Sequence, residues 1–341
     1  MSSRETLCLM ALTRVPRMSL ANVRSLVEAM GSATAVYEHR HELGDVLTSA
    51  RKPALDALAA MDIHMARAEQ ELEWAAHNGI QCLGIDDDNY PQRMRECADA
   101  PVILYYKGQA NLNARHVVAV VGTRHITEYG KDLCSGLMHD LHALCPDALV
   151  VSGLAYGVDI HTHRAALDEG NPTVAVLAHG LDQIYPRMHR DTAVRMLAQG
   201  GLLTEFMAGS PSRGLGDVYK RQVMAFPGRV TDGCSAGCNS LIRANRAALI
   251  TSAQDLVEMM GWETEAERRS ALARGIQPEL FPELSPEEQQ VAQALQGSDK
   301  CHLNQLSLHT DLPISRLSGI LFGLEMKGIV KMLPGGMYRL A

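Results

Sequence analysis

The sequence predicts an α/β protein built on a parallel sheet, with helices before the sheet and a smaller domain after it. Two apolar, β-branched runs, residues 117–121 and 148–152, are each followed at once by glycine and a helical pattern. This order is typical of consecutive βα units, whose strands are buried on both faces. Two further apolar runs, residues 173–180 and 201–206, extend the predicted sheet.

The turns after the first two strands predict a phosphate-binding edge. The carboxyl ends of parallel strands share one sheet edge, where helix N-termini offer unpaired N–H groups to anions. The candidate residues at these turns are Gly122, Thr123, Arg124, Ser152, Gly153 and Gly157. Glycine admits a phosphate close to the backbone, a hydroxyl can donate to it, and an arginine can bind two of its oxygens. Neither turn has G-x-G-x-x-G spacing, so we expect no dinucleotide cofactor.

Length and composition predict two or three domains in a cytoplasmic protein. The chain has 341 residues, of which 46% are hydrophobic, enough for a sizeable core. The net charge is -7 and aromatic residues make up 4%, so a nucleic-acid partner requires a local basic patch and not an aromatic platform. Eight scattered cysteines suit reduced thiols, and no signal peptide or membrane-spanning run is visible. Cys234 and Cys238 have zinc-like spacing, but without a second ligand pair we expect free thiols.

The first 61 residues predict a domain of short helices. A longer helix in residues 62–78 then leads into a strand near residues 81–85. The segment 12–32 is compatible with a helix-hairpin-helix or SAM-like module that touches DNA backbone, but it lacks the usual Gly-x-Gly turn. A structural cap on the sheet is the alternative.

Asp159 and His163 lie four residues apart at a predicted helix start, so they share one face and can fix each other's geometry. With His161, Asp182 and His189 they suggest a metal or acid/base cluster. The sequence does not place these residues on one face, and aspartate is a common helix N-cap. We therefore expect Asp159 and His163 to have structural, orienting roles, with no catalytic residue and no metal ligand.

Six motifs occur in an order that resembles one family. They are VGTR, SGLAYGVDIHTHRAAL, HGLDQIYPRMHR, GGLLTEF, FPGRVTD and SAGCNSLIRANRAALI. Over about residues 80–262 the chain resembles the bacterial DNA-processing protein A (DprA/Smf) family. The resemblance implies an extended Rossmann-like fold and a DNA-binding protein that is not an enzyme. It also implies single-stranded DNA binding, DNA protection in competence and natural transformation, loading of the RecA recombinase in DNA recombination, and a homodimer. Arg124 matches the arginine of the family's Gly-Ser-Arg motif, with Thr123 in place of serine.

The chain departs from this family between GGLLTEFMAGSPSR and VMAFPGR. The family has several tens of residues there, including a basic DNA-contact motif, whereas this chain has only GLGDVYKRQ, residues 214–222. Residues 217–222 are a translation of GATGTGTATAAGAGACAG, which resembles a transposon adapter used in sequencing libraries. We hypothesise an assembly scar that replaces real sequence. A parallel crossover needs a dozen or more residues, so we expect an irregular loop in residues 207–222 and a sheet that lacks an element, with strand edges uncovered.

Residues 213–246 form the most basic stretch, with six basic and two acidic side chains, although two of the basic ones belong to the suspect segment. Arg229 follows a glycine at a strand end, and Arg243 lies further along this stretch. Both are candidates for DNA contact at the same edge. Asn239 lies in a turn and can hydrogen-bond either backbone or phosphate.

Residues 263–284 are polar, charged and proline-marked, which predicts a linker between a domain at 62–262 and one at 285–341. In the last domain, helical patterns at 286–295, 303–309 and 314–327 precede two strand-like runs around residues 334–336. This order describes a winged helix, and Ser285 with Glu288 makes a capping-box pattern. Five basic residues meet five acidic ones there, so duplex readout, weak DNA contact and protein contact all stay open.

Two functions follow from the sequence. The first is a non-catalytic single-stranded DNA binder that hands DNA to a recombinase. The second is a Rossmann-like nucleotide-processing enzyme that uses Asp159, His163 and Asp182 on a phosphorylated small molecule.

Overall fold

The structure is a computed structural model that forms two compact units, residues 1–267 and 268–341. The described residues are 3–16, 18–43, 52–97, 99–210, 223–264, 266–267, 285–296, 301–310, 312–326, 329–333 and 337–340. The suspected scar at 214–222 and most of the predicted linker lie outside them. Within the described residues, no helix is long and apolar enough to cross a membrane.

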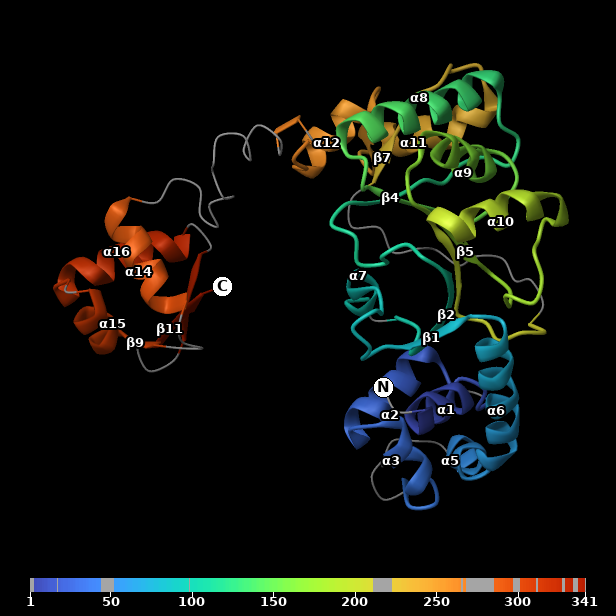
Figure 1. The fold of residues 1–341 in the computed structure, drawn as a ribbon, viewed down its shortest axis with the longest axis horizontal. Helices are drawn as coiled ribbons and strands as arrows, with labels where there is room; N and C mark the ends of the chain where they lie inside the picture. Colours follow the sequence, from blue (N-terminus) through green and yellow to red (C-terminus); the bar gives the residue numbers. More distant parts are fainter. Residues whose placement is uncertain are drawn as a thin grey trace. The chain divides into compact units, whose positions relative to one another are not determined.

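Six strands form the central sheet of the first unit, in the order β1-β2-β6-β5-β4-β3 (Figure 1). They are β1 (Gln81–Gly84), β2 (Ile103–Gly108), β3 (Val117–Ala119), β4 (Leu149–Ser152), β5 (Thr173–Leu177) and β6 (Gly201–Thr204). β3 to β6 pair in parallel, and β1 and β2 add an antiparallel edge. The predicted α/β class with a mostly parallel sheet is therefore confirmed.

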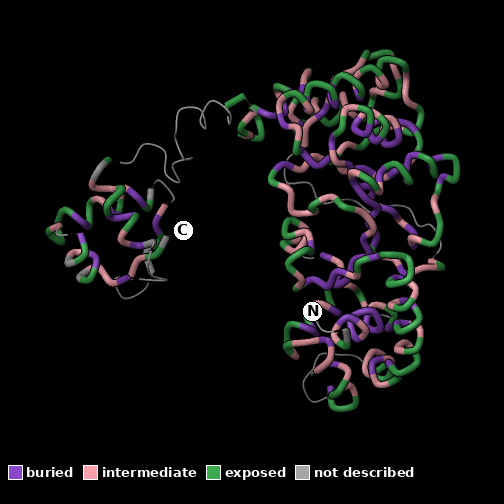
Figure 2. The backbone as a smooth tube through the Cα atoms, viewed as in Figure 1, coloured by how far each residue is buried: buried purple, intermediate pink, exposed green. Residues whose placement is uncertain are grey.

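A helix follows each of β3, β4 and β5, as the βα pattern predicts. These are α8 (Glu128–Leu144), α9 (Val158–Glu169) and α10 (Arg190–Gln199), the last preceded by the short 3₁₀ helix η1 (Arg187–His189). Side chains of α9 and α10 share a core with β5 and β6, while α8 and α12 (Ala253–Met260) share another with β4. Figure 2 shows that buried positions run through the middle of this unit.

A second, two-stranded parallel sheet lies in the same unit. It consists of β7 (Met224–Ala225) and β8 (Ala248–Leu249), and among the described strands it is separate from the central sheet. The 3₁₀ helix η2 (Gly233–Ser235) and helix α11 (Ala236–Arg243) connect its two strands. The expected loss of a sheet element concerns residues 207–222, most of which lie outside the described residues, so it stays a prediction.

The N-terminal helices share a hydrophobic core with the sheet. They are α1 (Ser3–Leu12), α2 (Leu20–Met30), α3 (Ala33–Glu38), α5 (Lys52–Ala59) and α6 (Asp62–His77). Leu9 and Met10 of α1 are buried in the same cluster as Tyr105 of β2. Arg24 of α2 also donates to the main-chain carbonyl of Cys97 at 2.7 Å. These helices therefore form a cap on the antiparallel side of the sheet. The short helix α7 (Gln92–Arg95) lies between β1 and β2 in the chain.

The second unit has the predicted order of a winged helix. Its elements are α14 (Pro286–Gln296), β9 (Cys301–His302), α15 (Leu303–Thr310), α16 (Ile314–Met326), β10 (Val330–Leu333) and β11 (Met337–Leu340), with the strands in the order β10-β11-β9. The capping box is present, since Glu288 accepts from the main-chain N–H of Ser285 at 2.8 Å and its own N–H donates to the Ser285 hydroxyl at 3.3 Å. The sequence did not predict β9, because a strand of two residues is too short to show an alternating pattern of apolar and polar side chains.

Candidate nucleic-acid interface

The turns after β3 and β4 touch each other, as the parallel topology predicts. The main-chain N–H of Val158 donates to the carbonyl of Thr123 at 3.1 Å. Gly157 has a φ of +77°, and a Cβ atom there would collide with the Thr123 carbonyl oxygen. Only glycine combines that backbone conformation with so close an approach, so Gly157 lets the second turn support the first.

Arg124 projects from this supported turn as an exposed side chain. No ion pair or hydrogen bond of its guanidinium is recorded with any described residue. An exposed guanidinium without a carboxylate partner keeps its full charge and five donors for an incoming anion. A buried Arg124 could not contact DNA. Because Arg124 is exposed, it stays a candidate for DNA contact.

Asp159 already occupies the helix N-terminus where a phosphate was expected. Its carboxylate is buried and accepts from the main-chain N–H of Ala155 at 3.4 Å. Burial raises the pKa of Asp159, and hydrogen bonds from the main chain of Ala155, Gly153 and Gly122 oppose that rise. The prediction that these turns offer free N–H groups is thus wrong for Gly122 and Gly153, because an internal carboxylate binds them. Asp159 instead holds the two turns together.

Ser152 has a structural position. Its side chain is buried, and its hydroxyl donates to the main-chain carbonyl of Val120 at 2.7 Å. This hydrogen bond joins the ends of β3 and β4. The hydroxyl is therefore not presented to a DNA phosphate, which corrects the expectation for this residue.

His163 is buried beneath the same turns as a neutral imidazole. Its Nδ1 lies 2.7 Å from the Thr173 hydroxyl, and that hydroxyl donates to the carbonyl of Val150 at 3.1 Å. Nδ1 must therefore carry the proton and donate it. Burial lowers the pKa of His163 to about 3. Asp159 and His163 were expected to fix each other, but each is fixed by other groups.

The alternative enzymatic cluster is not assembled in the described structure. Asp159 and His163 are buried with internal partners, while Asp182 is exposed on the loop after β5. His189 is also buried, and its Nδ1 lies 2.8 Å from the carbonyl of Leu154. Among the described residues, no group of three or more His, Cys, Asp or Glu side chains is placed to hold a metal ion.

A second arginine lies on a loop that contacts the Arg124 turn. Arg229 is exposed in the loop after β7. Two contacts join this part of the chain to the first turn: the Cys234 thiol donates to the carbonyl of His125 at 3.1 Å, and the Tyr129 hydroxyl donates to the carbonyl of Pro227 at 3.2 Å. Arg124 and Arg229 therefore project from neighbouring loops.

Asn239 braces the Arg229 loop. Its side-chain oxygen accepts from the N–H of Gly228 at 3.1 Å, and its amide group donates to the carbonyl of Gly228 at 3.0 Å. Of the two partners considered for Asn239, backbone or phosphate, the structure shows backbone. Arg243 lies exposed at the end of α11, with no buried residue in that helix.

Two further arginines at this sheet edge were missed in the sequence. Arg187 and Arg190 are exposed on either side of His189, whose hydrogen bond to Leu154 ties the segment to the turn after β4. The exposed Tyr156 ring also packs edge-on against His189, at 5.1 Å between centroids. The signal that could have revealed them is the pattern PRMHR directly after a strand and loop.

The described residues of the winged helix include three basic side chains: Arg316 on α16, and Lys331 and Arg339, which are exposed on β10 and β11. Arg316, the leading candidate for DNA contact on α16, pairs with Glu287 of α14 at 2.8 Å. Nearby on α16, Phe322 is 67% exposed. Glu287 engages Arg316 while Lys331 and Arg339 are exposed, so duplex readout, weak DNA contact and protein contact all stay open.

Comparisons with known proteins match almost the whole chain. The family model described as DNA recombination-mediator protein A matches residues 81–214 and 212–261, and that of the DprA winged helix domain matches residues 277–336. The chain belongs to the DNA-processing protein A (DprA/Smf) family. The family resemblance drawn from the ordered motifs is thus confirmed, and with it a role in DNA processing.

Relatives of this DprA-family chain include well-matched proteins from several bacteria. The putative DNA processing protein DprA of Mycobacterium tuberculosis (strain CDC 1551 / Oshkosh) is 32% identical over 377 residues, covering 95% of this chain and 92% of the relative. The DNA processing protein DprA of Streptococcus pneumoniae (strain R6) is 31% identical, covering 63% of this chain and 86% of the relative. The X-ray structure of DprA from Streptococcus pneumoniae has a TM-score of 0.52 at 25% identity, over 71% of this chain and 98% of that one.

Proposed function

We propose that this DprA-family protein binds single-stranded DNA by its phosphates, protects it and passes it to the RecA recombinase. The observation that carries the proposal is the exposed guanidinium of Arg124, which has no partner among the described residues, beside the exposed Arg229 on a loop that touches the Arg124 turn. Arg187 and Arg190 extend the positive charge along the same sheet edge. A row of arginines suits a repeating chain of phosphates better than a single small anion.

The contacts should come from side chains and not from the main chain. Asp159, in the first turn of α9, already accepts from main-chain N–H groups of the turns after β3 and β4, so a phosphate bound there would meet a buried carboxylate. Arginine contacts to phosphate carry no sequence information. Binding should therefore be similar for all sequences and strongly weakened by salt.

The test is a titration of labelled oligonucleotides at several salt concentrations, with Arg124→Ala as the variant. A charge-assisted hydrogen bond is worth about 1.5–3 kcal/mol, so affinity should fall roughly 10- to 100-fold for every sequence alike. The slope of log affinity against log salt should also shrink by about 0.7 for one lost phosphate contact.

The matched control is Arg195→Ala. Arg195 is an exposed arginine on α10 whose guanidinium pairs with Asp168 at 2.7 Å. It should leave both affinity and salt slope unchanged. Near-wild-type binding by Arg124→Ala would remove the site assignment.

Transfer to RecA needs its own assay. RecA hydrolyses ATP when it assembles on single-stranded DNA, so the proposed transfer should shorten the lag on DNA precoated with a single-strand-binding protein. Arg124→Ala should lose this effect in proportion to its loss of DNA affinity. The family resemblance also implies a homodimer, which light scattering would test.

A further inference from the structure

We propose that Glu71, on helix α6 of the N-terminal cap, is a positioning residue for DNA binding. It acts on the β5 loop, residues 178–186, which leads directly to Arg187 and Arg190. In this proposal Glu71 does not touch DNA; it acts through the main chain of Ala208. The inference rests on the proposed DNA binding and adds the N-terminal cap to the parts on which that binding depends.

Glu71 is a buried carboxylate on a helix whose other acidic side chains face solvent. Asp62, Glu69 and Glu73 are exposed, whereas Glu71 is 1% exposed. The guanidinium of Arg67, one helical turn earlier, lies 2.7 Å from the Glu71 carboxylate. A buried ion pair is seldom more stabilising than an apolar pair of similar size. The contacts that Glu71 makes therefore indicate its role better than a contribution to stability does.

Arg67 and Glu71 together bind both main-chain groups of Ala208, in the segment after β6. The N–H of Ala208 donates to the Glu71 carboxylate at 2.8 Å, and Arg67 donates to the carbonyl of Ala208 at 2.7 Å. We call these three residues the polar clamp. The two side chains lie 137 and 141 positions earlier in the chain than Ala208. The polar clamp therefore fixes the segment after β6 to the N-terminal cap.

The clamped segment packs directly against the β5 loop. Gly180 approaches it so closely that a Cβ atom would collide with the carbonyl oxygen of Met207. The side-chain amide of Gln183 donates to the carbonyl of Ser210 at 3.0 Å. Between these two contacts, Leu181 packs against both the core of the N-terminal helices and the core of α9 and α10. The β5 loop is thus held from the side of the cap.

His179 joins the two ends of the β5 loop. The side chain is 2% exposed, and its Nε2 accepts from the main-chain N–H of Tyr185 at 3.3 Å. The proton therefore lies on Nδ1, which donates to the carbonyl of Gly180 at 2.9 Å. Arg187 and Arg190, both exposed, follow this loop at the starts of η1 and α10. Their positions consequently depend on a loop that the polar clamp holds in place.

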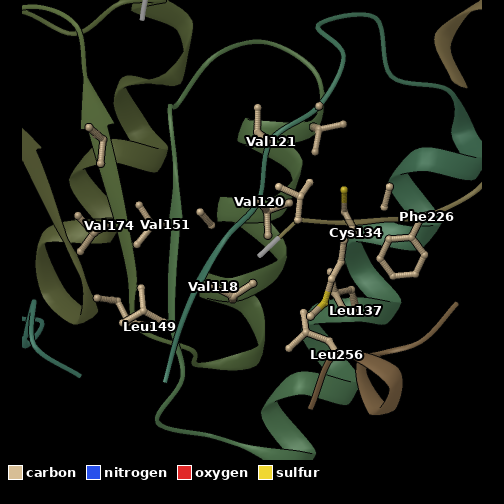
Figure 3. A pocket seen from close by; sticks show the side chains of 18 of the residues that line it. Val118, Val120, Val121, Cys134, Leu137, Leu149, Val151, Val174, Phe226 and Leu256 are labelled. Atoms are coloured by element: carbon tan, nitrogen blue, oxygen red, sulfur yellow. The ribbon is translucent and has the colours of Figure 1, made fainter. Parts of the chain in front are cut away.

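The Arg124 turn is held without the polar clamp. Figure 3 shows apolar side chains, such as Val121 and Phe226, around the cavity beside β3. Gly122 and Thr123, directly before Arg124, line the same cavity, and no residue of the polar clamp does. Loss of the polar clamp should therefore weaken the contacts made after the β5 loop and leave the Arg124 contact unchanged.

The test is the double variant Arg67→Met with Glu71→Met, in the oligonucleotide titration described above. One positive and one negative charge are removed, so the net charge of -7 is kept, and no unpaired buried charge remains. If the released loop keeps its binding geometry roughly one third to one tenth of the time, affinity should fall by about 3- to 10-fold. The salt slope should stay the same, because the bound state still makes the same phosphate contacts.

Two further variants accompany the double variant. Glu71→Gln keeps an oxygen that can accept from the N–H of Ala208, so its affinity should stay within about twofold of the parent. The matched control is Arg195→Gln with Asp168→Asn, which removes an exposed ion pair of α10 and α9 and should leave affinity unchanged.

A double-mutant cycle separates positioning from a general loss of structure. In a background with Arg187→Ala and Arg190→Ala, the double variant should cause no further loss of affinity. In the Arg124→Ala background it should keep its full effect. Hydrogen exchange at the amide of Tyr185 should also become at least about threefold faster in the double variant, because the loop opens more often.

Gln183→Ala gives the same test without touching a buried side chain. Gln183 is exposed, and its loss removes the hydrogen bond between the β5 loop and Ser210. Affinity should fall by about two- to threefold, since one hydrogen bond of the loop is lost. This loss should also disappear in the Arg187→Ala, Arg190→Ala background.

The proposal is overturned if the folded double variant binds within twofold of the parent, or if its loss of affinity is equal in both backgrounds. A smaller salt slope would mean that Arg67 itself contacts phosphate. Should the double variant not fold, unchanged binding by Gln183→Ala refutes the positioning role. If neither Arg124→Ala nor Arg187→Ala with Arg190→Ala weakens binding, the proposed function fails and this inference with it. If those variants weaken binding while the double variant does not, only the positioning role is wrong.

Discussion

The buried His163 should make the first unit less stable as the pH falls below neutrality. In the folded state burial lowers its pKa to about 3, whereas in the unfolded chain the ordinary value is about 6.5. Between these values the unfolded state binds one more proton than the folded state, so unfolding is favoured as protons are added. The contribution of His163 to stability is therefore complete above about pH 6.5 and is lost progressively below it.

The size of the effect follows from one proton. Stability should change by up to about 1.4 kcal/mol for each pH unit in this window, or roughly 2.3 kcal/mol between pH 6.5 and 4.5. His163→Gln keeps an amide donor for the Thr173 hydroxyl, which lies 2.7 Å from Nδ1 in the parent, but it cannot titrate. The variant should lose this part of the pH dependence while other groups keep theirs.

The assay is urea unfolding at several pH values, followed by tryptophan fluorescence. Both tryptophans, Trp74 and Trp262, lie in the first unit, so the signal reports the unit that contains His163. His77→Gln, which changes an exposed imidazole at the end of α6, is the control and should follow the parent. Parallel pH profiles for His163→Gln and the parent would refute a neutral, buried imidazole.

Three more substitutions test the parts that hold or flank the interface. Gly157→Ala forces a side chain into a φ of +77°, so it should cost at least about 1–2 kcal/mol in thermal unfolding and weaken DNA binding in a gel shift. Unchanged stability would contradict the close approach. Asn239→Ala should cost about 1–3 kcal/mol in urea unfolding, because both main-chain groups of Gly228 lose a partner; a neutral result would exclude the brace. Arg316→Ala should keep oligonucleotide affinity within about twofold, since Glu287 engages this arginine, and a larger loss would assign DNA contact to the winged helix.

Local patterns in the sequence were enough to place most of the elements. The βα order with its glycine turns predicted β3, β4 and β5 with their helices, and the helical periods predicted α14, α15 and α16 closely. Each of these signals lies within a few residues of the chain. The two-residue strand β9 was missed because its pairing with β11 is a tertiary contact.

The chemistry of the candidate site was harder to predict, because it depends on which groups are already engaged. Asp159 was expected to cap a helix, but its reach to the turn after β3 joins residues more than thirty positions apart. The hydrogen bond from Ser152 to Val120 is likewise set by the pairing of two strands. A sequence shows that a serine or glycine is present at a turn, whereas only the fold shows whether its donor is free.

The difference between engaged and free polar groups also explains why the proposed DNA binding depends on the exposed arginines more than on the glycines of the turns. The N–H of Ala155, in the turn before α9, donates to the buried carboxylate of Asp159, and the N–H of Val158 at the start of α9 donates to the carbonyl of Thr123, so these donors hold the two turns together. Arg124 and Arg229 have no such internal partner among the described residues and project from the fixed turns. A rigid scaffold that presents long, charged side chains can follow the irregular path of a flexible polynucleotide, because the side chains adapt while the turns stay in place.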